Sequence, residues 1–240
     1  MSNLRIALVA EGPTDYEIIQ AALKAILPAP FVLTRLQPEA SPSRPQMGNG
    51  WCGVLKWCRE MSKQCSGNID TEPTLELFDW IILHIDVDVA ATQYSDCGAN
   101  IQQESINLGW QTLPCTKPCP PVVDTVAALQ QVVESWLKPA SASANTVFCL
   151  PAQSSGTWLA AAHLPDEHLL FGQMECNLTL ENRLADLPVK SGLRIRKSKR
   201  EYQQHAPKIT EQWERVKQHC SQAQVFESAI LNLLSIANTP

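Results

Sequence analysis

Three carboxylates follow two strongly apolar segments of the chain. Glu11 comes directly after LRIALVA at 4–10, and Asp86 and Asp88 lie at the acidic end of FDWIILHIDVDV at 78–89. If both segments are strands of one parallel sheet, their carboxyl ends meet at the edge where such sheets bind ligands. Because three neighbouring carboxylates repel one another, they favour a bound cation. Oxygen ligands suit Mg²⁺ or Mn²⁺, and such an ion can polarise a phosphodiester for attack by water.

The first of these segments belongs to a βαβ pattern. The run 4–10 is rich in Leu, Ile and Val, as in a parallel strand that is buried on both faces. A Glu-Gly-Pro turn ends it, and Thr14 and Glu17 then have the spacing of a capping box, which predicts a helix to about Leu27. The segment 31–36 predicts a second strand, so strand, helix and strand follow one another.

The second segment predicts the direction of its two aspartates. Side chains two residues apart in a strand point to one face, so Asp86 and Asp88 are expected to point the same way. His84 falls on that face too and is a candidate to line the site, although a single strand histidine is more often part of a core. Ser154, Ser155 and Thr157 follow another apolar segment and could be small polar groups at its exit, although helix capping is the simpler interpretation.

The rest of the chain alternates between helical and extended patterns. Helices are predicted over 51–64 and 123–137, a strand over 146–150, a short helix over 158–163 and a helical tail over 207–237. This alternation is typical of an α/β fold with a mainly parallel, Rossmann-like central sheet flanked by helices and a helical C-terminal extension.

We expect two parts in the chain. Residues 1–165 would form the α/β domain, and 166–240 would form a basic segment and a helical C-terminal extension packed on it. Residues 37–50, QPEASPSRPQMGNG, read as a long Pro/Ser/Gly-rich loop, and a loop of that length in a compact domain is usually functional or mobile.

The charge of the chain is unevenly distributed. With 19 basic and 24 acidic residues among 240 the net charge is −5, so the chain as a whole is no general binder of polyanions. The run KSGLRIRKSKR at 190–200 is different, because it holds six basic residues and no acidic one. They are Lys190, Arg194, Arg196, Lys197, Lys199 and Arg200. Such a cluster neutralises phosphates, which predicts contact with nucleic acid or a nucleotide; docking on an acidic partner surface is the alternative.

The cysteines and the apolar segments predict the compartment. No long apolar stretch precedes Glu11, and the longest uncharged run, 146–164, is too polar to span a bilayer, so neither a signal peptide nor a membrane span is expected. The nine cysteines include no CxxC pair, and their simplest interpretation is reduced thiols of a cytoplasmic protein. Cys115 and Cys119 lack a matching Cys/His pair at zinc-finger spacing, so a structural zinc is not favoured.

The order of the acidic motifs resembles that of a known family. LVAEGPTDYEII followed by ILHIDVDV looks like the Toprim fold, in which a Glu follows the first strand and an Asp-x-Asp follows a later one. Toprim domains occur in primases, type IA and II topoisomerases, recombination proteins and OLD-type nucleases. The Glu-Gly-Pro-Thr-Asp form and the segment with Pro151, Ser154, Trp158 and Leu159 look closest to small stand-alone bacterial Toprim-like proteins. The resemblance covers about residues 4–165.

The resemblance implies roles for individual residues. Glu11 would be a general acid/base or a metal ligand, Asp86 and Asp88 would bind Mg²⁺ or Mn²⁺, and Gly12 would allow a close backbone approach at the turn. The resemblance also implies a role in defence against mobile DNA, beside a partner ATPase. The chain departs from the family pattern in QSSGTWLAAA, where Gly156 stands near the place expected for an acidic residue, and this weakens the predicted metal site.

Three hypotheses about function remain open. The first is a Mg²⁺-dependent phosphodiester-cleaving, nuclease-like enzyme in which Glu11 relays protons, Asp86 and Asp88 hold the metal, and 190–200 binds nucleic acid. The second is a non-catalytic Toprim-like partner or regulatory subunit of an ATPase complex. The third is a haloacid-dehalogenase-like phosphatase with an aspartate nucleophile. Two features disfavour the third: Ala90 stands where that family has Thr, and the motif lies on a later strand than in that family.

Overall fold

The predicted fold class is confirmed. The computed structural model describes residues 3–38 and 47–237, and these form an α/β fold around a four-stranded sheet that is parallel throughout, in the order β2-β1-β3-β4. The strands are β1 (Leu4–Val9), β2 (Phe31–Gln37), β3 (Trp80–His84) and β4 (Thr146–Cys149). The central strands β1 and β3 are buried on both faces over most of their length, as expected for parallel strands under helices, whereas the edge strands β2 and β4 are partly exposed.

Ten α-helices accompany the sheet within the described residues. The first five are α1 (Pro13–Ile26), α2 (Trp51–Gln64), α3 (Ala99–Asn107), α4 (Val123–Leu137) and α5 (Gly156–His163). The C-terminal part holds α6 (Leu180–Ala185), α7 (Lys199–His205), α8 (Pro207–Glu211), α9 (Trp213–His219) and α10 (Ser221–Ala237). None of the helices in 3–38 and 47–237 has both the length and the apolarity that crossing a membrane requires.

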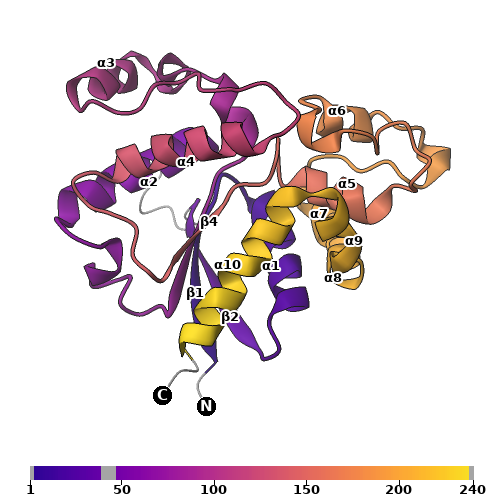
Figure 1. Cartoon of the computed structure of the whole chain (residues 1–240), viewed down its shortest axis with the longest axis horizontal. Coiled ribbons are helices and arrows are strands. Elements are labelled where there is room, and N and C mark those ends of the chain that lie inside the picture. Colours follow the sequence, from indigo (N-terminus) through magenta and orange to yellow (C-terminus); the bar gives the residue numbers. More distant parts are fainter. Residues whose placement is uncertain (1–2, 39–46, 238–240) are drawn as a thin grey trace.

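The sheet separates two hydrophobic clusters because side chains alternate along each strand. Ile6 and Leu8 of β1 point into the cluster that contains α1 and α10, whereas Ala7 and Val9 point into the cluster that contains α2 and α4. Figure 1 shows this arrangement, with α1 and α10 together and α2 and α4 together. Helices on both faces are what the βαβ pattern of the sequence predicts.

The C-terminal helices share the core of the α/β part. Tyr202, Ile209 and Trp213 are buried in the same cluster as α1 and α5, and the rings of Trp158 and Trp213 lie 5.5 Å apart. Helices α7 and α8 pack against α1, and α9 packs against α5. The segment that follows the sheet is therefore held firmly near the strand ends.

The order of strands places a switch point between β1 and β3. The chain runs from β1 to β2 on one side and then crosses to β3 on the other side of β1. In open α/β sheets, ligands bind at the carboxyl ends of the strands where this reversal occurs. Glu11 follows β1 and Asp86 follows β3, so the predicted carboxylates lie at this point.

The predicted strand 78–89 is too long. β3 ends at His84, and Val87–Ala91 form a 3₁₀ turn that begins just after Asp86, with Asp88 in its first turn. The backbone N–H of Val89 bonds to the carbonyl of Asp86, which turns the chain out of the extended conformation. The expectation that Asp86 and Asp88 share one face of a strand is therefore wrong.

The cap of α1 differs from the sequence prediction. The start of α1 is capped by Asp15, whose Oδ2 accepts the backbone N–H of Gly12 at 2.8 Å, rather than by the predicted pair of Thr14 and Glu17. Most of the predicted loop 37–50 lies outside the described residues.

Candidate metal centre

The carboxyl ends of β1, β3 and β4 are joined by side-chain hydrogen bonds. Glu11 accepts the backbone N–H of Asp86 through Oε1 at 2.8 Å, across a separation of 75 residues. Asp86 accepts the backbone N–H of Ser155, which follows β4, through Oδ1 at 2.8 Å. The early acid and one of the later pair thus lie side by side, as the sequence predicted.

Asp15 extends this network from the first turn of α1. Its Oδ1 accepts the hydroxyl of Ser155 at 2.7 Å, while its Oδ2 accepts the backbone N–H of Gly12. Ser155 therefore donates to Asp15 through its hydroxyl and to Asp86 through its backbone. Two buried carboxylates are held in fixed positions by one residue that follows β4.

Asp15, His84 and Asp86 could together hold a metal ion. One ligand atom from each residue lies within 4.8 Å of the other two, and all three side chains are buried. Two carboxylate oxygens and one imidazole nitrogen form a donor set that suits divalent transition metals such as Mn²⁺. Of the predicted ligands Glu11, Asp86 and Asp88, only Asp86 belongs to this group.

The environment of His84 is the strongest indication that this group binds a metal ion. Its side chain is fully buried, and neither ring nitrogen has a hydrogen-bond partner among the described residues. Nε2 lies 3.2 Å from Asp86 Oδ1, but the two atoms are not aligned as a hydrogen bond. Because an unpaired buried polar atom is destabilising, an imidazole in this setting is favoured as a metal ligand.

The crowded carboxylates shift the pKa values in the site. Burial, followed by the charges of Asp86 and Asp15, raises the pKa of Glu11 well above its ordinary value. Burial and then Asp15 raise the pKa of Asp86, although His84 opposes them. Burial acts to lower the pKa of His84, but the two neighbouring aspartates outweigh it and raise that pKa. These shifts show an excess of negative charge that a cation would relieve.

Lys197 brings a positive charge from the basic run to the site. Its Nζ lies 2.8 Å from Glu181 Oε2 and 3.9 Å from Asp86 Oδ2. Glu181 is also held by Tyr202, whose hydroxyl donates to Oε1 at 2.7 Å. The Glu181 carboxylate packs directly against Gly156, where a larger side chain would collide with it. Helix α6 thus supplies the acidic group that the sequence lacks near position 156.

Asp88 lies at the outer side of the site. Its side chain is exposed, in contrast to the buried Asp86, and its backbone N–H donates to the carbonyl of Gln153 at 3.0 Å. Partial desolvation and then the charge of Asp86 raise the pKa of Asp88 to about 7, with Lys197 opposing. Asp88 is therefore near the buried group without being part of it.

The basic run 190–200 divides into two sets in the structure. Lys197 reaches the acidic site, as described above. The other predicted nucleic-acid-binding residues are exposed or half-buried: Lys190, Arg194, Arg196, Lys199 and Arg200. Contact of this run with nucleic acid stays a prediction.

Two disulfides contradict the expectation that all nine cysteines are reduced. Cys52 pairs with Cys97, and Cys119 pairs with Cys176, with Cα atoms 5.5 and 5.7 Å apart. Each pair joins segments that are distant in sequence, so spacing alone does not reveal it. The remaining thiols are buried or half-buried, as expected: Cys58, Cys65, Cys115, Cys149 and Cys220.

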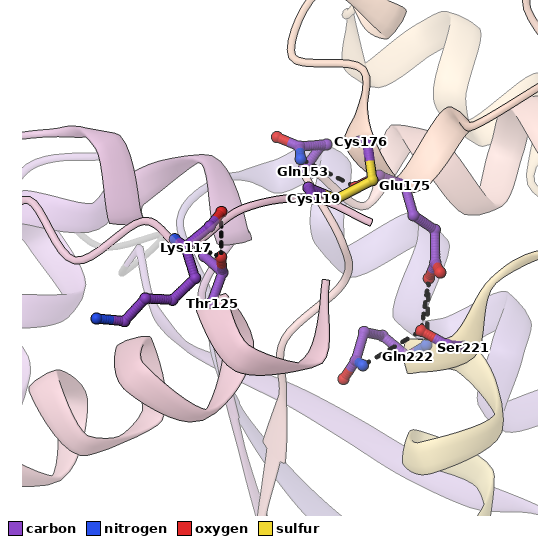
Figure 2. The surroundings of a disulfide bond; sticks show 8 residues. All are labelled: Lys117, Cys119, Thr125, Gln153, Glu175, Cys176, Ser221 and Gln222. Atoms are coloured by element: carbon purple, nitrogen blue, oxygen red, sulfur yellow. Dashed lines mark hydrogen bonds between the residues drawn. A yellow bond between two sulfur atoms is a disulfide. The ribbon is translucent and has the colours of Figure 1, made fainter. Parts of the chain in front are cut away.

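The Cys119–Cys176 disulfide lies close to the backbone that positions Asp88. Figure 2 shows Gln153 beside the disulfide, with its Nε2 donating to the carbonyl of Glu175 at 2.9 Å. The carbonyl of Gln153 accepts the N–H of Asp88, and Gln153 itself has a φ of 63°, which residues other than glycine rarely adopt. The disulfide thus fastens the segment before α4 to the one that contacts Gln153.

Sequence reasoning missed two acidic residues of the site. Asp15 had a local signal, because it follows Glu-Gly-Pro-Thr in the first turn of a helix that starts at the strand end. Glu181 had none, since it comes from the six-residue helix α6, whose place against Gly156 depends on long-range packing. The candidates His84 and Ser155 do lie in the site.

Comparison of the chain with protein-family models, curated proteins and solved structures finds no match. The findings support a four-stranded parallel α/β fold with a buried group of two aspartates and one histidine that could bind a metal.

Proposed function

We propose that the protein is a metal-dependent, nuclease-like phosphodiesterase that acts on nucleic acid. The observation that carries the proposal is the buried group of Asp15, His84 and Asp86 at the sheet's switch point, in which neither ring nitrogen of His84 forms a hydrogen bond with the described residues. The adjoining basic run 190–200 supports a polyanionic substrate. The order of the acidic motifs, which resembles that of Toprim domains, agrees with this proposal.

The three buried residues would hold the ion. The imidazole of His84 favours Mn²⁺ over Mg²⁺, because Mg²⁺ strongly prefers oxygen ligands. When bound, such an ion polarises a phosphoryl oxygen and favours attack by water. The donor set and its burial restrict the choice of metal.

The other residues of the site orient groups and balance charge. Glu11 holds the Asp86 backbone, and Ser155 fixes both buried carboxylates through its hydroxyl and its N–H. Lys197 places a positive charge beside Asp86, where an approaching phosphate would otherwise meet only carboxylates. Asp88 is exposed at the outer side of the site, where its carboxylate would accept a proton from the attacking water.

Manganese binding and cleavage test the proposal together. Isothermal titration should show one Mn²⁺ bound per chain, and labelled DNA and RNA oligonucleotides should reveal metal-dependent cleavage. Asp86→Asn should remove both while keeping the fold, as checked by circular dichroism, whereas the exposed Asp124→Asn should change neither. Cleavage that survives in Asp86→Asn, or a folded wild type without Mn²⁺ binding, would refute the proposal.

A non-catalytic partner or regulatory subunit is the second candidate. The ion pair of Lys197 with Glu181 favours it, because this ammonium group, also near Asp86, partly neutralises the acidic site without any added ion. The role in defence and the partner ATPase are proposals that rest on the sequence resemblance alone.

Lys197→Met separates the two candidates. In the metal-dependent enzyme, loss of a cation about 4 Å from Asp86 should tighten Mn²⁺ binding about fivefold, which corresponds to roughly 1 kcal/mol. In the non-catalytic protein, the same change should lower stability and produce no Mn²⁺ binding.

A further inference from the structure

A pocket beside α7 is lined by groups that can bind an anion. Its volume is about 350 Å³, which lies in the range of small-ligand sites. Most of its lining side chains are hydrogen-bond donors. They are Arg194, Ser198, Arg200, Gln204 and His205.

The two arginines of this pocket have no partner within residues 3–38 and 47–237. Neither guanidinium of Arg194 or Arg200 forms an ion pair or a hydrogen bond with the described residues. By contrast, Arg59 donates through Nε to Glu104 at 2.8 Å and so links α2 to α3. The donors of the pocket arginines therefore remain available for a ligand.

The acidic residue of the pocket is already engaged. Glu201 also lines it, and its Oε2 accepts the backbone N–H of Arg196 at 2.6 Å. Two guanidinium groups oppose this single carboxylate among the described lining residues, so the pocket keeps a net positive charge. An anion that enters it meets more donors than acceptors.

The segment that carries the pocket arginines is firmly anchored. Ile195 is 2% exposed, and its N–H bonds to the carbonyl of Leu184. Two residues further on, Lys197 is tied to Glu181 at the acidic site. Arg194 and Lys197 thus leave the same short stretch for different sites, one for the pocket and the other for Asp86.

We propose that this pocket binds one phosphate group of the nucleic-acid strand and so fixes the strand relative to the metal centre. The identification of the bound polymer as nucleic acid rests on the proposed function. Paired guanidinium groups suit the proposal because each can donate two parallel hydrogen bonds to phosphate oxygens. The phosphate is either a terminal monoester or an internal diester, and the binding experiment distinguishes them.

The test compares two double variants that lose the same charge. Arg194→Ala/Arg200→Ala empties the pocket of guanidinium groups, while Arg196→Ala/Lys199→Ala removes two charges of the same run whose side chains do not line it. Fluorescence anisotropy would measure binding of a single-stranded oligonucleotide with either a 5′-phosphate or a 5′-hydroxyl. The buffer contains EDTA and a fixed salt concentration, and thermal melting confirms that each variant is folded.

The pocket variant should bind at least about tenfold more weakly than wild type, and the matched variant only about threefold more weakly. A loss confined to the 5′-phosphorylated strand assigns a terminal phosphate, and an equal loss for both strands assigns an internal diester. Equal weakening by the two double variants, or no binding by folded wild type, would overturn the proposal. Because no metal is present, a failure of Mn²⁺ binding or cleavage would leave this result standing.

Discussion

Replacing Gly156 with alanine should displace Glu181 from the site. A Cβ at position 156 would lie 2.7 Å from Cγ and 2.8 Å from Cδ of Glu181, which is closer than carbon atoms approach. Gly156 starts α5 in a buried position, so the longer Glu181 side chain is the group that has to move. Its carboxylate would then leave the hydroxyl of Tyr202 and the ammonium of Lys197.

The size of the effect follows from these two contacts. Tyr202 is 2% exposed, so loss of its acceptor should cost about 1–3 kcal/mol. The half-exposed ion pair of Lys197 adds roughly 0.5 kcal/mol. A helical alanine regains about 0.5–1 kcal/mol relative to glycine. The free energy of unfolding should therefore fall by about 2 kcal/mol.

Urea unfolding of the variants of a double-mutant cycle measures this loss of free energy of unfolding. Gly156→Ala and Glu181→Ala should each destabilise the protein, but the double variant should be no less stable than Glu181→Ala alone, because the collision is then gone. Gly67→Ala is the control, since open space surrounds that glycine. A Gly156→Ala protein within roughly 0.5 kcal/mol of wild type, or additive losses in the double variant, would refute the reasoning.

Three further changes test other parts of the structure. Replacing both Cys119 and Cys176 with serine should lower the free energy of unfolding by about 4 kcal/mol, because the disulfide joins residues 57 positions apart; equal guanidinium unfolding curves without reductant would contradict this. Tyr94→Phe should cost about 1–3 kcal/mol in urea unfolding, since the indole N–H of Trp136 loses its partner at 3.0 Å, and an unchanged midpoint would show that this bond is unimportant. Burial lowers the pKa of His163 from 6.5 to about 4, so the unfolded chain takes up the proton first and stability falls as the pH drops from 6.5 towards 4. His163→Gln should therefore lose about 1 kcal/mol less than wild type between pH 7 and pH 5, after allowance for partial exposure, and parallel stability curves would be the contrary result.

Much of the fold could be predicted because parallel strands under helices leave a simple pattern. The apolar runs 4–10 and 31–36 and the Glu-Gly-Pro turn between a strand and a helix predicted β1, α1 and β2 to within about one residue. The same pattern failed after His84. Val87 and Val89 are buried in a 3₁₀ turn, so the apolar run continues beyond the last residue of β3. The apolar pattern therefore does not reveal where this strand ends.

The candidate site could be predicted only where strand ends determine it. Glu11 and Asp86 meet because β1 and β3 are neighbours, which follows from the order of apolar segments and turns. Glu181 and Lys197 reach the site through the packing of a short helix and an irregular segment, which carry no periodic signal. The disulfides could not be predicted for the same reason, because each forms between segments that are distant in the sequence.

A crystal structure with bound metal would show whether Asp15, His84 and Asp86 hold an ion. Crystals grown with Mn²⁺ would be examined by an anomalous difference map at a wavelength near the manganese absorption edge. We expect one strong peak among Asp15, His84 and Asp86, with a nitrogen of His84 as one of the metal ligands. A map without a peak between these three residues, or with the manganese held by other side chains, would contradict it.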